Sequence, residues 1–202
     1  MLKLRVEQDE DPINPRKEYD NASRMVCFHK KYDLGDKHGY DSGDFNGWVE
    51  LRAYLEQEEG PLVACKPLHL FDHGGITIKT GPFHDKWDSG QVGFVFVTEE
   101  ECKKGMGREG TKEERDAWAE RIIEGEVETY DKYLRGDVYC FDVYDDETDE
   151  VLESCGGFFG EEYCRQEGES TLNYLLVKAE QAAFEAEELS WIEFGKLLEV
   201  AV

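Results

Sequence analysis

Three common features are missing from the sequence: a long apolar run, a close pair of cysteines, and a cluster of basic and aromatic residues. No stretch approaches the roughly 18 consecutive apolar residues of an ordinary membrane-spanning helix. The opening residues also lack the apolar core of a signal peptide, so we expect a soluble, cytoplasmic protein without a membrane partner. Because basic residues nowhere gather around aromatic ones, we expect no direct binding of nucleic acid.

Cofactor-binding motifs are absent as well. The six cysteines are widely spaced, so we expect free thiols in a reducing compartment rather than disulfides or a zinc site. Gly74-Gly75 opens a predicted strand, whereas a phosphate-binding loop closes a strand and opens a helix. We therefore expect no bound cofactor.

Basic residues are scarce relative to acidic ones. The chain has 47 Asp and Glu against 23 Lys and Arg, a formal net charge of -24. Residues 1–97 contribute a net -5 and residues 98–202 a net -19. Glu outnumbers Asp and Lys outnumbers Arg, which argues against adaptation to high salt. Such a negative field repels nucleic acid and attracts basic protein surfaces, especially clefts that bind nucleic acid.

Apolar residues make up 40% of the chain and aromatic residues 12%, enough for a folded core. Apolar runs separated by turn residues predict strands at 2–6, 25–28, 62–71, 76–80 and 92–97. The polar turn 145–150 separates two further runs, which predicts a hairpin of 138–144 with 151–159.

Helices are predicted from Asn46 to Glu59, from Thr98, over 111–124 and over 127–134, each with a capping residue or a glycine stop. Two apolar stripes predict a helical C-terminus: Leu172, Leu175, Leu176, Ala179, Ala183 and Ala186, then Trp191, Phe194, Leu197 and Leu198. We therefore predict a single α+β domain over 1–202. Its mainly antiparallel sheet would carry helices packed on one face.

The predicted helix 111–124 has a distinctly acidic side. At 100° per residue Trp118 and Ile122 face the core, and the opposite side carries a row of four carboxylates: Glu113, Asp116, Glu120 and Glu124. Neighbours in this row are roughly 5–6 Å apart, a looser spacing than that of DNA phosphates, which repeat about every 3.4 Å along one strand. The row either imitates a phosphate track or is simply a solvated helix face whose acids pair with nearby basic residues.

The predicted hairpin turn is the second acidic feature. Five of its six residues are acidic, namely Asp145, Asp146, Glu147, Asp149 and Glu150. The spacing of a calcium-binding loop is absent, so a calcium site is not indicated. The turn either promotes solubility or contacts a basic partner.

Histidines provide the main alternative chemistry. His69 and His73 lie four residues apart on a predicted strand with His84 nearby, which would permit a metal site and a small metal-dependent enzyme. The spacing fits no common zinc motif, and hydrogen-bonded turn histidines are the simpler interpretation. Cys27 and His29 share a strand face, but catalytic Cys–His pairs normally meet across a fold. Trp87 belongs either to the core or to the rim of a partner site.

Three segments have a recognisable pattern: GPFHDKWDSGQVGFVFV (81–97), EGEVETYDKYLRGDVYCFDV (124–143) and CGGFFGEEYC (155–164). They resemble an uncharacterised family of small acidic proteins encoded by phages and prophages, over about residues 22 to 165. The resemblance implies a phage accessory protein acting in a bacterial cytoplasm and transfers no catalytic residue.

We therefore expect a non-enzymatic inhibitor of a host defence system of the restriction or CRISPR type. It would present an acidic, DNA-mimicking surface to the basic cleft of a nucleic-acid-binding host protein. Two alternatives stay open. One is an accessory protein that binds another host or phage protein without DNA mimicry, and the other is the metal-dependent enzyme.

Overall fold

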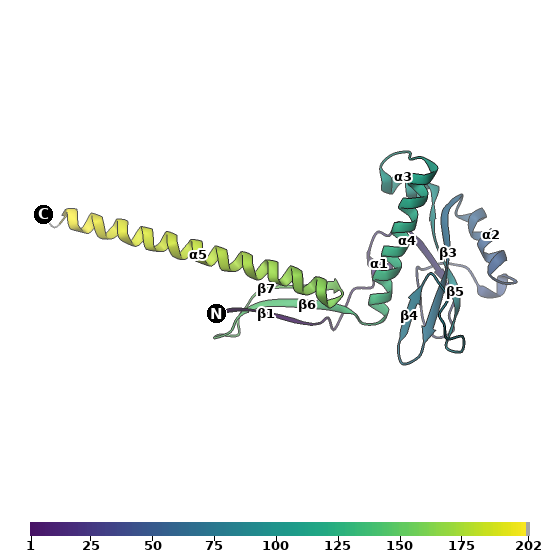
Figure 1. Cartoon of the computed structure of the whole chain (residues 1–202), viewed down its shortest axis with the longest axis horizontal. Coiled ribbons are helices and arrows are strands. Elements are labelled where there is room, and N and C mark those ends of the chain that lie inside the picture. The colour runs from purple at the N-terminus through teal and green to yellow at the C-terminus, as the bar shows by residue number, and fades with distance from the viewer. Residues whose placement is uncertain (201–202) are drawn as a thin grey trace. The chain divides into compact units, whose positions relative to one another are not determined.

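The computed structural model describes residues 1–200, with every side chain except those of residues 190 and 192–200. Contacts group the chain into two compact units, which we call the terminal unit (Met1–Glu10 with Val138–Val202) and the central unit (Asp11–Asp137). Both contain helices and antiparallel strands (Figure 1), which confirms the predicted α+β class. The described strands form two sheets, one in each unit, rather than the one sheet that we predicted.

The central unit contains a four-stranded antiparallel sheet in the order β2-β5-β3-β4. Its strands confirm those predicted for this part of the chain: β2 (Arg24–Cys27), β3 (Leu62–Asp72), β4 (Ile76–Lys79) and β5 (Ser89–Thr98). β2 and β5 approach closely at Gly93, where a Cβ atom would lie 2.0 Å from the Val26 carbonyl oxygen. The sheet therefore requires a glycine at this position.

Helices cover both faces of this sheet, whereas we predicted helices on one face. Successive residues of a strand point to opposite faces, so β2 and β5 supply apolar side chains to both. On one face α2 (Trp48–Glu58) packs Leu51 and Leu55 against the sheet. On the other face α4 (Lys112–Leu134) buries Ala119, Ile123, Val127 and Tyr130. Shorter helices complete the unit: α1 (Pro15–Glu18), η1 (Ser42–Asp44) and α3 (Glu99–Met106).

Helix α4 is continuous where we predicted two segments separated at Gly125. A glycine inside a helix costs roughly 1 kcal/mol relative to alanine. Ile123 and Val127, on either side of this glycine, are buried against the sheet and hold the helix together. Trp118 and Ile122, which we placed on the core face, lie partly buried beside this line.

The predicted helix starts are confirmed at two threonines and differ at α2. Thr98 accepts a hydrogen bond from the Glu101 N–H, and Thr111 forms a complete capping box with Glu114. Helix α2 starts after Gly47 without a side-chain cap. Asn46, our predicted cap, instead donates to the Glu50 carboxylate from both its backbone N–H and its side-chain amide.

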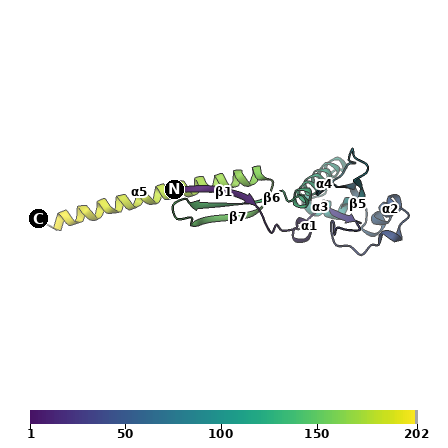
Figure 2. The same cartoon turned by 90° about the horizontal axis from the view of Figure 1, so that it is seen from below.

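The terminal unit contains a three-stranded antiparallel sheet in the order β1-β6-β7. Its strands are β1 (Leu2–Gln8), β6 (Val138–Asp145) and β7 (Val151–Phe159), and they confirm the predicted first strand and hairpin. Helix α5 (Glu161–Val200) packs its first turns on this sheet (Figure 2). The close approach occurs at Gly168, where a Cβ atom would lie 2.6 Å from Leu4 Cδ1.

The predicted C-terminal stripe is partly buried, and only at its start. Leu172 and Leu175 pack against the sheet of the terminal unit. From Leu176 to Leu189 every residue of α5 is exposed, including the remaining members of the first stripe, which are Ala179, Ala183 and Ala186. In the second stripe Trp191 is exposed, and the side chains of Phe194, Leu197 and Leu198 lie outside the described residues.

Candidate partner-binding surfaces

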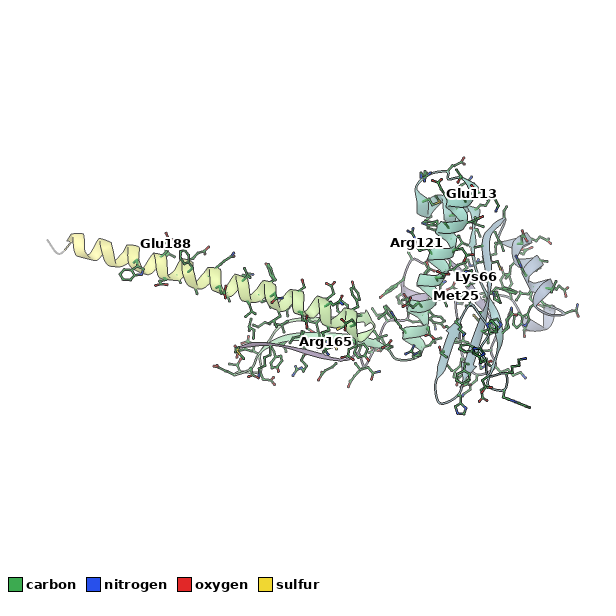
Figure 3. All side chains as sticks on the ribbon, viewed as in Figure 1. Met25, Lys66, Glu113, Arg121, Arg165 and Glu188 are labelled. Atoms are coloured by element: carbon green, nitrogen blue, oxygen red, sulfur yellow. The ribbon has the colours of Figure 1, made fainter. Side chains whose placement is uncertain are left out.

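The predicted acidic row lies along α4, but most of its charge is paired. The Asp116 carboxylate lies 2.7 Å from Lys112 Nζ. Lys66 on β3 forms an ion pair with Glu120 and lies 3.7 Å from Glu124. Figure 3 labels Lys66 and, on α4, Glu113. Three of the four carboxylates therefore face a cation, and Asp116 and Glu120 are half-buried rather than fully solvated.

Glu113 is the remaining member of the row. Hydrogen bonds from its own backbone N–H and from Thr111 lower the pKa of its carboxyl group below the ordinary value. Glu113 is therefore charged at neutral pH, but one such carboxylate does not make a phosphate-like track. The row resembles a locally balanced helix face more closely than a continuous anionic surface.

The acidic turn between β6 and β7 is also partly neutralised, here by strand β1. The N-terminal amino group lies 3.2 Å from Asp145 Oδ2 and 3.9 Å from Glu147 Oε1. Lys3 Nζ lies 2.6 Å from Asp146, and Arg5 lies 3.9 Å from Asp149. The pKa of Asp145 is lowered, first by the Glu147 N–H and then by the N-terminal amino group. Of the five acids in this turn, four therefore have a cation within ion-pairing distance, and the fifth is Glu150.

Exposed acids without such partners lie on α5, where we had predicted only an apolar stripe. Residues 176–189 contain one lysine, Lys178, and four glutamates, namely Glu180, Glu185, Glu187 and Glu188. Figure 3 labels Glu188 on this part of the helix. All four are exposed, and among the described side chains no cation lies within ion-pairing distance of them. The strongest uncompensated charge among the three acidic surfaces is thus on α5.

The same part of α5 exposes large apolar side chains. Leu189 is 63% exposed and Leu176 39%, and both continue the stripe that Leu172 and Leu175 begin on the sheet. Val177 and Phe184 are also exposed but lie singly on the opposite side of the helix. Scattered exposed apolar residues are ordinary on a protein surface, whereas exposed residues that continue a packed stripe indicate a contact surface. The sequence predicts an apolar stripe on this helix, but apolar spacing does not reveal whether a covering layer exists.

An open cleft of about 1070 Å³ lies in the central unit. Its floor includes the buried residues Leu70 and Val92, and its walls include the half-buried Phe28 and Trp48. Trp87 lines the cleft with 96% of its surface exposed, which excludes the core position that we considered for it. Charged residues such as Lys30 and Asp72 also line it, so the cleft offers both apolar and polar contacts.

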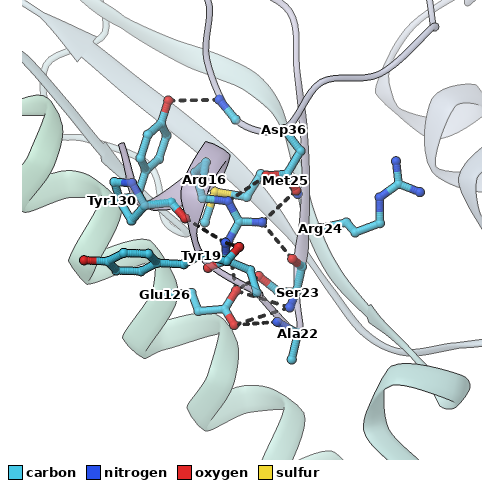
Figure 4. Close-up of polar contacts among 12 residues, drawn as sticks. Arg16, Tyr19, Ala22, Ser23, Arg24, Met25, Asp36, Glu126 and Tyr130 are labelled. Carbon is cyan, nitrogen blue, oxygen red and sulfur yellow. Dashed lines mark hydrogen bonds and ion pairs between the residues drawn. The ribbon is translucent and has the colours of Figure 1, made fainter. Parts of the chain in front are cut away.

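A buried ion network holds the loop that lines this cleft (Figure 4). Arg16, whose side chain is 1% exposed, donates two hydrogen bonds to Asp36, at 2.8 and 2.7 Å, and one to Glu126 at 2.8 Å. Glu126 also accepts hydrogen bonds from the backbone N–H groups of Ala22 and Ser23. The network joins α1, the start of β2 and α4 to the cleft loop.

Cys27 and His29 are not arranged for nucleophilic catalysis. Burial raises the pKa of the Cys27 thiol to about 12, so it stays protonated at neutral pH. His29 Nδ1 accepts from the backbone N–H groups of Lys31 and Tyr32, at 3.3 and 3.2 Å. All six cysteines are free thiols.

The three histidines considered as metal ligands have separate environments. His73 Nδ1 lies 2.9 Å from Asp88, and His84 is exposed. The pKa of His69 is lowered by burial and then by Lys79. Within the part of the chain that the structure describes, no group of three or more His, Cys, Asp or Glu is placed to hold a metal ion. The metal-enzyme alternative thus has no geometric support among these residues.

Comparisons with protein families, curated proteins and solved structures found no match to this chain. Among the described residues, no helix combines the length and the apolar character that crossing a bilayer requires.

Proposed function

We propose that this chain is a non-enzymatic accessory protein of phage origin that binds a basic, nucleic-acid-binding protein of a host defence system. The observation that carries the proposal is the uncompensated acidic surface of α5, where Glu180, Glu185, Glu187 and Glu188 are exposed without described cations. It lies in the half of the chain that has a net charge of -19. Complementary charge of this kind accelerates association and selects basic partners.

DNA mimicry is a weaker part of this proposal than charge complementarity. Fourteen helical residues span roughly 20 Å, over which one DNA strand has about six phosphates. Residues 176–189 provide four carboxylates over that length. The pairing of Asp116, Glu120 and Glu124 on α4 leaves less charge there than the sequence suggested. An accessory protein that binds without mimicry is therefore the second candidate.

The test compares two variants, each with four substitutions that remove four negative charges. One carries Glu→Gln at residues 180, 185, 187 and 188. The other changes the α4 row, with Glu113→Gln, Asp116→Asn, Glu120→Gln and Glu124→Gln. Each tagged protein is used for affinity capture from a bacterial lysate, with washes at low and then high salt.

The proposal predicts that the parent captures nucleic-acid-binding proteins and that the high-salt wash releases them. The α5 variant should fail to capture these proteins. A guide-RNA-loaded CRISPR nuclease and a restriction enzyme then test inhibition of DNA cleavage directly. If the α5 variant captures the same proteins as the parent at every salt concentration, its acids have no part in binding and the proposal fails.

A further inference from the structure

The apolar face that anchors α5 on its own sheet continues beyond the sheet. At 100° per residue, a single arc of about 140° contains Leu172, Leu175, Leu176, Ala179, Ala182, Ala183, Ala186 and Leu189. Leu172 and Leu175 pack on the sheet, and every later member of the arc is exposed. The helix thus presents roughly 20 Å of apolar surface that no described residue covers.

Acidic side chains border one edge of this arc, where Glu180 and Glu187 lie seven residues apart. At the other edge Lys178, the one basic residue between Leu176 and Leu189, lies next to the arc, and Glu185 lies just beyond it. An occupant of the arc must therefore offer apolar side chains at its centre and positive charge at the rim that meets Glu180 and Glu187.

We infer that residues 176–189 of α5 pair with a basic amphipathic helix of the partner protein. This inference rests on the proposed function and adds the mode of contact. The alanines along the arc permit close approach of a second helix. Leu176 and Leu189 supply apolar anchors at the two ends of this exposed segment. Lysines or arginines beside the apolar stripe of the partner helix meet Glu180 and Glu187.

A second copy of this chain is disfavoured by charge. Residues 161–189 contain eight acidic and two basic side chains. Pairing two copies along α5 brings a net -6 against another -6. A basic partner helix replaces this repulsion with attraction.

The test uses the full-length protein and a synthetic 18-residue helix of leucine and lysine, with leucines spaced to form one apolar face. Isothermal titration gives the dissociation constant at low and moderate salt. The matched variants are Leu176→Ser with Leu189→Ser on the arc, and Val177→Ser with Phe184→Ser on the opposite side. Circular dichroism checks that each pair of substitutions leaves the helical content unchanged.

The arc variant should weaken binding by at least about tenfold, since burial of each leucine contributes more than a factor of ten. The variant on the opposite side should bind like the parent. Glu180→Gln with Glu187→Gln should weaken binding at low salt and reduce its salt dependence.

Three results would overturn the inference. In the first, both apolar variants weaken binding equally. In the second, only the acidic variant weakens binding, which leaves the proposed function intact but removes helix pairing. In the third, the parent self-associates in light scattering and the arc variant does not, which makes a second copy the occupant. A different result would count against the proposed function alone: the parent captures no nucleic-acid-binding protein from the lysate, but it still binds the peptide through the arc.

Discussion

Substitution of Arg16 by alanine should strongly destabilise the central unit. The Arg16 side chain is 1% exposed, and its guanidinium lies within 2.8 Å of carboxylate oxygens of both Asp36 and Glu126. Those carboxylates are themselves only 19% and 18% exposed. Removing the cation leaves two mostly buried anions without a counter-charge.

Breaking a buried pair by removing one partner typically costs about 3–5 kcal/mol. Most domains unfold with a free energy of roughly 5–15 kcal/mol, so the loss is a large fraction of the total. It corresponds to a fall in melting temperature of roughly 6–20 °C for a chain of this size. Arg16→Lys should lie between parent and Arg16→Ala, because an ammonium group retains the charge but not the two-pronged contact with Asp36.

Urea unfolding followed by tryptophan fluorescence measures this loss, because Trp48, Trp87 and Trp118 all lie in the central unit. The matched control is Arg108→Ala, which removes an exposed arginine that also makes two contacts with one carboxylate, that of Glu114. The control should unfold close to the parent.

Arg16→Met combined with Asp36→Asn and Glu126→Gln should recover much of the stability lost in Arg16→Ala, since no buried charge then remains unpaired. If Arg16→Ala costs less than about 1 kcal/mol, the value of an exposed pair, then water reaches the carboxylates and the reasoning from burial is wrong.

Three further predictions concern packing, pH and thiol reactivity. Gly168→Val should destabilise the terminal unit by roughly 1–3 kcal/mol through overpacking against Leu4 and Phe141. A Cβ atom added at Gly125 would meet nothing within 4 Å, so Gly125→Ala should raise the free energy of unfolding by about 1 kcal/mol. Thermal melting compares the two variants, and equal effects of both substitutions would contradict the packing at Gly168. The pKa of Glu114 is lowered to about 2, mainly by Arg108. Its contribution to stability is therefore complete above its ordinary pKa and is lost as the pH falls toward 2. Because this pair is exposed, as the Arg108→Ala control assumes, Glu114→Gln should flatten the acid side of the melting profile only slightly. A large change at acid pH would contradict the exposure of the pair. Under native alkylation followed by mass spectrometry, exposed Cys155 should react well before the buried Cys27, whose pKa is about 12; rapid labelling of Cys27 would show that β2 is open.

Much of the fold was predictable because its signals are local. The turn 145–150 and the capping box of Thr111 with Glu114 depend on residues a few positions apart, and both are as expected. Gly125 was misleading because its helix is held by the packing of Ile123 and Val127 on a sheet that the local sequence does not reveal. The division of strands into two sheets likewise depends on pairing β1 with β6, more than 130 residues apart.

The state of the acidic surfaces was not predictable for the same reason. Lys66, which faces Glu120 and Glu124, lies more than fifty residues before them on another element. Lys3 and Arg5 reach the acidic turn only because β1 runs antiparallel to β6. A count of acidic residues gives the total excess of charge, whereas the cations brought in by the fold decide where that excess remains.

Solubility and partner binding make different demands on α5, and its composition separates them. A helix selected for solubility alone would combine its glutamates with polar residues on every exposed face. Along residues 176–189, exposed leucine and alanine side chains instead form one apolar side of the helix beside the glutamates. Exposed apolar surface promotes association, and the nearby charge makes that association selective for basic partners. The two features together favour binding as the role of this helix, and neither would do so alone.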